Sequence, residues 1–210
     1  MRGVDRFNAT IKSADADKTP GFDAAKQDFR QSADNAQKAV EFTQKEEVRT
    51  DAPGLAAQNT RKLNALLART ESMRLFVTKA DPTKADAGLT AFNEYIAAEP
   101  DPVKKQKARM DAAQMLLDAG AGDKAVLEYQ KVLAEKPDDP DATLGAGLAL
   151  YATGDKVKFQ EAANYLQRFV EKAPDGHKDK ETIKAVLAEL KASENIVPEK
   201  TTPTSRRRRP

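Results

Sequence analysis

Three prolines stand 37 residues apart in this chain of 210 residues, at Pro100, Pro137 and Pro174. Each one ends a segment of the same pattern. A small residue lies twelve positions before the proline, and large apolar residues follow that small residue at the same positions in each segment. The aligned sets are Gly88, Ala125 and Ala162; Phe92, Tyr129 and Leu166; Tyr95, Val132 and Phe169; and Ile96, Leu133 and Val170. Offsets of 0, 4, 7 and 8 mark one face of an α-helix, so the pattern predicts one helix repeated three times.

A repeated helix of this kind cannot bury its apolar stripe alone, and stacking against neighbouring helices completes the core. The predicted fold is therefore all-α, an α-solenoid that offers surface for binding. The composition agrees, because 32% of the residues are charged, 40% are hydrophobic and tryptophan is absent. The lack of cysteine excludes disulfides, thiolate nucleophiles and sulfur-rich metal sites.

Helical periodicity continues on both sides of the repeats. Apolar residues spaced by three and four predict two long helices, over about 22–48 and 55–79, separated by Pro53 and Gly54. After Pro174, one apolar face and one charged face predict a terminal helix that caps the stack. The predicted organisation is a flexible lead over 1–20, two long helices within 21–83, repeats over 84–175, a capping helix over 176–194 and a disordered tail over 195–210.

The repeats resemble the tetratricopeptide repeat, a helix–turn–helix unit of 34 residues, over about 84–175. In one unit the matching positions are Gly120, Ala125, Tyr129, Val132 and Pro137, and in the next they are Gly147, Gly154, Ala162, Leu166, Phe169 and Pro174. Two departures stand out. Arg109 and Thr143 replace the bulky residue that the family has early in its first helix, and three extra residues within 156–158 lengthen one turn between helices. The resemblance implies a TPR-like solenoid of helix–turn–helix repeats.

The resemblance also implies which residues pack the repeats together. They are the small residues Gly88, Ala125, Gly147 and Ala162 and the prolines Pro100, Pro137 and Pro174. Gly147 falls where the two helices of one unit approach closely, so a large side chain there should overpack the interface. Alanine at the same position should be tolerated or even stabilising, because alanine is the better helix former.

In tetratricopeptide arrays the first helices line a concave groove that binds partners. Carried over to this chain, the groove positions are Lys107, Met110, Gln114, Leu117, Leu144, Leu148 and Tyr151. Members of the family that hold a terminal carboxylate use Lys, Arg and Asn there, whereas Met110, Leu144 and Leu148 are apolar, which disfavours a carboxylate clamp. Two interpretations of this apolar strip stay open: it accepts an amphipathic helix of a partner, or a helix from residues 22–79 of the same chain covers it.

Residues suited to catalysis or metal binding are scarce. The chain has one histidine, His177, in a loop after the last repeat, where it is expected to be solvated. A Ser-His-Asp triad, a Cys-His pair and a histidine-based metal site therefore lack parts. The glycine pairs have neither the preceding strand nor the third glycine of a dinucleotide site. We expect no enzyme activity, no cofactor and no bound metal.

The end of the chain, PEKTTPTSRRRRP, is rich in proline and in small polar residues, a composition typical of disorder. Arg206, Arg207, Arg208 and Arg209 are suited to weak, salt-dependent contact with nucleic acid or an anionic membrane, or they simply keep the chain soluble. No apolar run is long enough to span a membrane, and no signal peptide is visible. A cytoplasmic protein is the default expectation, and an exported one follows if the chain is part of a longer precursor.

These observations predict a non-catalytic scaffold that binds a protein or peptide in an apolar concave groove. The partner's identity does not follow from the sequence. The alternative from another functional class is an accessory protein of nucleic acid or of the cell envelope, anchored by the basic tail.

Overall fold

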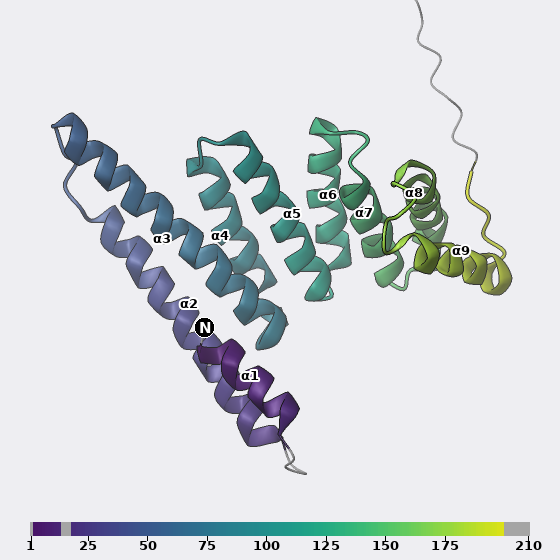
Figure 1. Ribbon diagram of the computed structural model, residues 1–210, viewed down its shortest axis with the longest axis horizontal. Helices are drawn as coiled ribbons and strands as arrows, with labels where there is room; N and C mark the ends of the chain where they lie inside the picture. The colour runs from purple at the N-terminus through teal and green to yellow at the C-terminus, as the bar shows by residue number, and fades with distance from the viewer. Residues whose placement is uncertain (1, 14–17, 200–210) are drawn as a thin grey trace, which may run out of the picture. The chain divides into compact units, whose positions relative to one another are not determined.

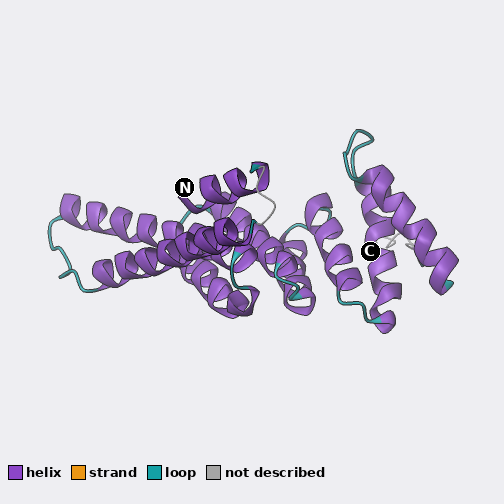
Figure 2. Cartoon of the chain, turned by 90° about the horizontal axis from the view of Figure 1, so that it is seen from below, coloured by secondary structure: helices purple, strands orange, loops and turns teal. Residues whose placement is uncertain are grey.

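The computed structural model describes residues 2–13 and 18–199, and within these ranges the chain forms α-helices, two short 3-10 helices and no strand (Figures 1 and 2). The prediction of an all-α fold is therefore confirmed. The helices are α1 (Arg2–Lys12), α2 (Thr19–Gln44), α3 (Ala52–Lys79), α4 (Ala85–Ala98), α5 (Pro102–Asp118), α6 (Gly122–Glu135), α7 (Pro140–Ala152), α8 (Phe159–Lys172) and α9 (Lys180–Glu194).

The chain divides into two compact units, Met1–Ala121 and Gly122–Pro210. In the first unit α1 packs on α2, α2 on α3, α3 on α4 and α4 on α5, and α3 also touches α5. In the second unit α6, α7, α8 and α9 pack in the same consecutive manner. Each helix thus covers the apolar stripe of the next helix within its unit, as the repeat pattern requires.

The repeated segment forms three helices of equal length. Helices α4, α6 and α8 each have 14 residues and begin at Ala85, Gly122 and Phe159, 37 residues apart. The aligned large residues at the second and third positions of the pattern are buried in all three, namely Phe92, Tyr95, Tyr129, Val132, Leu166 and Phe169. Residues at the same positions of the repeat therefore form the buried face of each of the three helices.

The three prolines do not pack the repeats, contrary to the expectation from the resemblance. Pro100, Pro137 and Pro174 are exposed and follow the last residue of α4, α6 and α8 by two positions. Proline disfavours helical geometry in the residue before it and offers no N–H to continue a helix. These residues therefore set where the repeated helices end, and the packing comes from other residues.

Small residues do make the close approaches between helices. Ala125 and Ala162 are fully buried, and a Cβ atom at Gly88 would lie 2.6 Å from the sulfur of Met115. At Gly147 in α7, a Cβ atom would lie 2.7 Å and 2.9 Å from two side-chain carbons of Leu166 in α8 and 3.2 Å from its backbone nitrogen. The close approach expected at Gly147 is present, but the expected tolerance of alanine is wrong, because even one methyl group displaces Leu166.

The three extra residues of the lengthened turn form a short 3-10 helix, Lys156–Lys158, directly before α8. The Asp155 side chain starts it by accepting a hydrogen bond from the Val157 N–H at 3.0 Å. A matching 3-10 turn, Pro82–Lys84, precedes α4, where Asp81 accepts from the Thr83 N–H. The insertion is therefore absorbed locally, and the register of the repeated helix is kept.

Residues 2–12 are not a flexible lead, because they form α1, which packs along α2 (Figure 1). The ring of Phe7 lies 5.2 Å from that of Phe22 and 6.5 Å from that of Phe29, and Val4 packs on the same cluster. The signal was present in the sequence, because Val4, Phe7 and Ile11 are spaced by three and four residues, as on one face of a helix. The prediction of a flexible lead did not take this spacing into account.

The chain beyond α9 also departs from the prediction. Asn195 adopts a left-handed conformation with φ of 56° and turns the chain back, so that residues 196–199 lie along α8. The expected absence of contacts beyond Glu194 is wrong for residues 195–199. The rest of the predicted tail lies outside the described residues.

Candidate functional site

A groove with an apolar floor lies among α3, α4 and α5 of the first unit. Its volume is about 230 Å³, and its lining is mostly apolar. The lining residues are Leu67, Thr70 and Glu71 of α3, Phe92 and Tyr95 of α4, and Lys104, Lys107, Ala108 and Asp111 of α5. The second helix of the three, α4, supplies the large rings, and the other two supply the walls.

The floor is built from buried residues, whereas one wall is exposed and apolar. Phe92, Tyr95, Thr70 and Ala108 are buried, and the Thr70 hydroxyl is satisfied by donating to the Leu67 carbonyl at 2.7 Å. Leu67 is 42% exposed at the edge of this floor. Leu66 and Leu67 are adjacent residues of α3 and point about 100° apart. Leu66 is the buried one, which leaves Leu67 free for the groove.

The rim of the groove carries charges of both signs. On α5 the Lys107 ammonium lies 2.6 Å from the Asp111 carboxylate, and Lys104 lies one turn earlier. On α3 the Glu71 carboxylate pairs with Arg74 at 3.0 Å. The groove therefore combines an apolar centre with an ion-paired edge.

A hydrogen-bonded pair under the groove fixes the turn between α4 and α5. The Tyr95 hydroxyl donates to the Glu99 carboxylate at 2.6 Å, and the same carboxylate accepts from the Asp101 N–H at 3.0 Å. Asp101 in turn caps α5 by accepting from the Val103 N–H at 2.8 Å. Burial, with the hydrogen bond to Glu99, raises the pKa of Tyr95 to about 12. The hydrogen bond from Tyr95 holds the pKa of Glu99 below its ordinary value.

We expect Tyr95→Phe to lower the thermal stability of the protein at neutral pH, because Glu99 stays buried without its strongest hydrogen-bond donor. A lowered folded-state pKa means that the contribution of Glu99 is present above pH 4.5 and is lost as the pH falls through the folded value. The raised pKa of Tyr95 means that its contribution is present below pH 10.0 and is lost as the pH rises toward about 12.

Melting curves at several pH values test this pair. The difference in Tm between the parent and Tyr95→Phe should be largest near neutral pH and should shrink in both acid and strong alkali. Tyr165→Phe is the matched control, since the Tyr165 hydroxyl accepts only a long bond of 3.5 Å from Gln130. A Tm difference that stays constant from pH 3 to 12 would contradict the assigned coupling.

Four of the predicted groove residues lie on α5 in the first unit. Lys107 lines the groove described above. Met110 and Leu117 are half-buried, and Gln114 is exposed and donates to Asp118 at 2.7 Å. Of this set, the structure brings only Lys107 to the groove among α3, α4 and α5.

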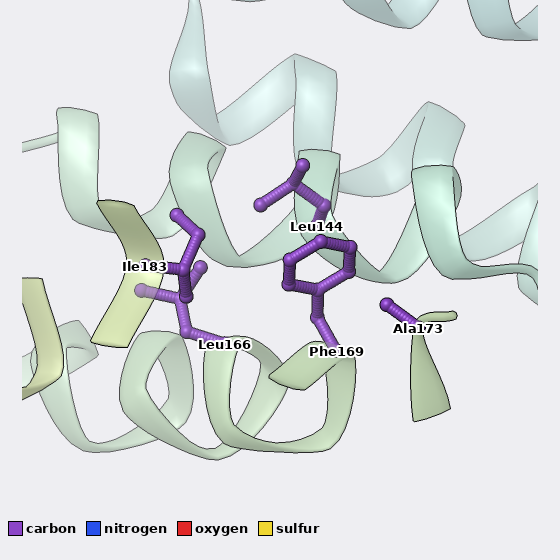
Figure 3. Close-up of a cluster of buried hydrophobic side chains, with 5 residues drawn as sticks. All are labelled: Leu144, Leu166, Phe169, Ala173 and Ile183. Carbon is purple, nitrogen blue, oxygen red and sulfur yellow. The ribbon is translucent and has the colours of Figure 1, made fainter. Parts of the chain in front are cut away.

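The other three predicted groove residues lie on α7 in the second unit and are not an open strip. Leu144 is buried in a cluster with Leu166, Phe169, Ala173 and Ile183, on which Leu148 also packs (Figure 3). The ring of Tyr151 lies 5.4 Å from that of Phe159, in a neighbouring cluster with Leu190. Helices α8 and α9 pack on these residues, so Leu144, Leu148 and Tyr151 belong to the core of the second unit.

His177 is not a solvated loop residue, as the sequence had suggested. Its side chain is 18% exposed, and its ring meets that of Phe169 edge-on at 4.9 Å. Nε2 lies 3.4 Å from an Asp141 carboxylate oxygen, and Nδ1 accepts a hydrogen bond from the Asp179 N–H. The imidazole thus connects the loop after α8 to the first turn of α7 and the start of α9.

The remaining expectations concern the arginines near the end of the chain, metal binding and the membrane. Arg206, Arg207, Arg208 and Arg209 lie outside the described residues, so the polyanion contact stays a prediction. In the ranges that the structure describes, no three His, Cys, Asp or Glu side chains gather in a way that could hold a metal. None of the described helices is long and apolar enough to cross a membrane.

Leu67 is a groove residue that sequence reasoning did not single out. It falls in the apolar pattern of the helix predicted over 55–79. The pattern gives no signal for its exposure, because adjacent apolar residues of a helix can both be buried, as Phe76 and Val77 are in α3.

Comparison of the chain with protein-family models, with curated proteins and with solved structures gave no match.

Proposed function

We propose that this protein is a non-catalytic, TPR-like helical scaffold that captures an amphipathic helix of a protein partner in the groove among α3, α4 and α5. The observation that carries the proposal is Leu67, a leucine 42% exposed beside a floor made by Phe92 and Tyr95. An apolar side chain from a partner would cover both Leu67 and the floor. The resemblance of residues 84–175 to a family of interaction modules supports the same class of function.

The size of the groove favours a protein partner over a small molecule. Pockets that bury drug-sized ligands have volumes of roughly 300–1,000 Å³, whereas this groove has about 230 Å³. Such a volume suits one or two large side chains presented by a helix. An amphipathic helix in a groove anchors itself through side chains of this kind, spaced by three and four residues.

The charges around the groove suit the edge of an interface. A protein interface typically has an apolar centre surrounded by a polar rim that remains accessible to water. Here Lys104 and Lys107 lie on one wall, with Glu71 on the other. Asp111 pairs with Lys107, and Arg74 pairs with Glu71, so both walls carry ion pairs that suit a polar rim.

A substitution at Leu67 tests the proposal. Leu67→Asp should reduce partner capture about tenfold or more, which is the value of burying one large apolar side chain. Its effect on Tm should be small, because Leu67 lies at the surface with 42% of its area exposed, so a charge there stays hydrated. The matched control is Leu127→Asp in α6, since Leu127 is 58% exposed and does not line the groove. The control should capture the partner as the parent does.

The partner itself is found by photo-crosslinking. A benzophenone amino acid placed at Lys107 on the rim should crosslink a protein from the source cells, and the same amino acid placed at Leu127 should not. Mass spectrometry identifies the crosslinked protein, and the purified pair is then used to measure Kd for Leu67→Asp. A Kd unchanged by that substitution, with a partner crosslinked equally from both positions, would reject the groove as the binding surface.

A further inference from the structure

The segment that follows α9 is held on α8 through its backbone. After Asn195 reverses the chain, the Ile196 N–H donates to the Leu190 carbonyl at 3.2 Å. Two amide side chains of α8 bind the backbone of the residues that follow. Gln160 Nε2 donates to the Val197 carbonyl at 2.9 Å, and the Asn164 side-chain oxygen accepts from the Glu199 N–H at 2.8 Å.

The two amides are placed to reach one edge of an extended chain. Gln160 and Asn164 are four residues apart on a helix, which places them about 6 Å apart along its axis. The carbonyl of one residue and the N–H two residues later lie on the same edge of an extended chain, within its two-residue repeat of about 6.6 Å. Gln160 Nε2 also donates to the Asn164 side-chain oxygen at 3.2 Å, so each amide orients the other.

One aliphatic side chain anchors the segment. Ile196 is partly buried against a cluster formed by Phe159 and Ala163 of α8 and Leu190 of α9. Val197, by contrast, is 56% exposed. The segment therefore contacts the helices through one aliphatic side chain and three backbone groups, of which α8 binds two, and the Val197 side chain is free to vary.

Pro198 suits its place between the two hydrogen-bonded groups. Its nitrogen carries no hydrogen, so no backbone donor at that position is left without a partner. A proline also biases the preceding residue, here Val197, toward extended geometry. The segment consequently loses little conformational freedom when it binds.

We propose that the face of α8 around Gln160 and Asn164 is a binding site for extended peptide segments of the pattern aliphatic-x-Pro-x, and that residues 195–199 occupy it in cis. The ligand is such a segment of a protein partner, because the site recognises backbone groups and one aliphatic side chain, which any chain of this pattern offers. The intrachain segment acts as a latch that a partner segment displaces. This site is separate from the groove among α3, α4 and α5 and does not depend on it.

The latch is tested first in the full chain. Hydrogen exchange followed by NMR should show the Glu199 amide protected in the parent, because its N–H is bound to Asn164. Asn164→Ala should remove that protection. Gln167→Ala, which changes another amide of α8 that bonds Glu171 and not the latch, should leave it intact.

The site is then tested with a peptide of the sequence of residues 193–199 as the probe. The receptor is full-length protein in which Glu199→Pro removes the latch N–H, and Ile196→Asp is the second latch-released variant. Titration should shift the side-chain amide signals of Gln160 and Asn164 in either variant, and several-fold less in the parent, whose latch competes as a tethered ligand. Methylation of the peptide nitrogen equivalent to that of Glu199 should weaken binding about fivefold, the value of one hydrogen bond.

Each of the following results would contradict the proposal. An unprotected Glu199 amide in the parent would show that the latch is absent and would overturn the proposal. So would a peptide that shifts no amide signal in both released variants, or one that binds equally well when its nitrogen is methylated. A parent that sediments as a dimer while Ile196→Asp is a monomer would show that a second copy supplies the segment in place of a partner.

Discussion

Replacing Gly145 with alanine is expected to lower the free energy of unfolding by about 2 to 3 kcal/mol and the Tm by roughly 5 to 10 °C. A Cβ atom at this position of α7 would lie closer than 3 Å to three carbons of the Tyr129 ring in α6. That ring is 1% exposed, so it has no free space to move into. The better helix propensity of alanine stabilises the protein by only about 1 kcal/mol, which is less than the cost of the clash with Tyr129.

Gly176 provides the matched control for this substitution. It has no atom within 4 Å of its would-be Cβ and no positive φ, so Gly176→Ala should melt like the parent or slightly above it. Thermal scans followed by circular dichroism give both values. A Gly145→Ala protein that melts with the parent would show that α6 and α7 are further apart than the structure places them.

Replacing Leu144 with aspartate is expected to destabilise the second unit by about 3 to 5 kcal/mol. The carboxylate would lie among the apolar side chains of Leu166, Phe169 and Ile183. The loss combines the missing leucine with the cost of an unpaired buried charge. Urea denaturation at neutral pH measures it directly.

Leu127→Asp serves as the control here, because Leu127 is 58% exposed and a charge at that position stays hydrated. Its urea midpoint should match that of the parent to within a few tenths of a molar unit. If Leu144→Asp were equally harmless, the α7 face would be open to solvent, and the cover supplied by α8 and α9 would be wrong. The outcome therefore decides whether α7 is core or binding surface.

The repeat itself was predictable because its causes are local. Residues at offsets of 0, 4, 7 and 8 share one face of a helix whatever surrounds them. The start of α8 was predictable in the same way, since the extra residues at 156–158 had to be absorbed before the register resumed. A binding surface is different, because exposure depends on what the rest of the chain covers.

The sequence by itself determined that this protein is all-α, that α4, α6 and α8 repeat every 37 residues, and that Gly147 falls where two helices approach closely. Tertiary structure alone decided which apolar faces remain open. Leu144 and Leu67 look alike in the pattern, yet α9 closes over the cluster that holds Leu144, whereas the described helices of the first unit leave Leu67 42% exposed. The position of residues 195–199 was also decided by the tertiary structure. Side chains of α8 bind the backbone of these residues, and a pattern of side chains does not predict contacts of the backbone.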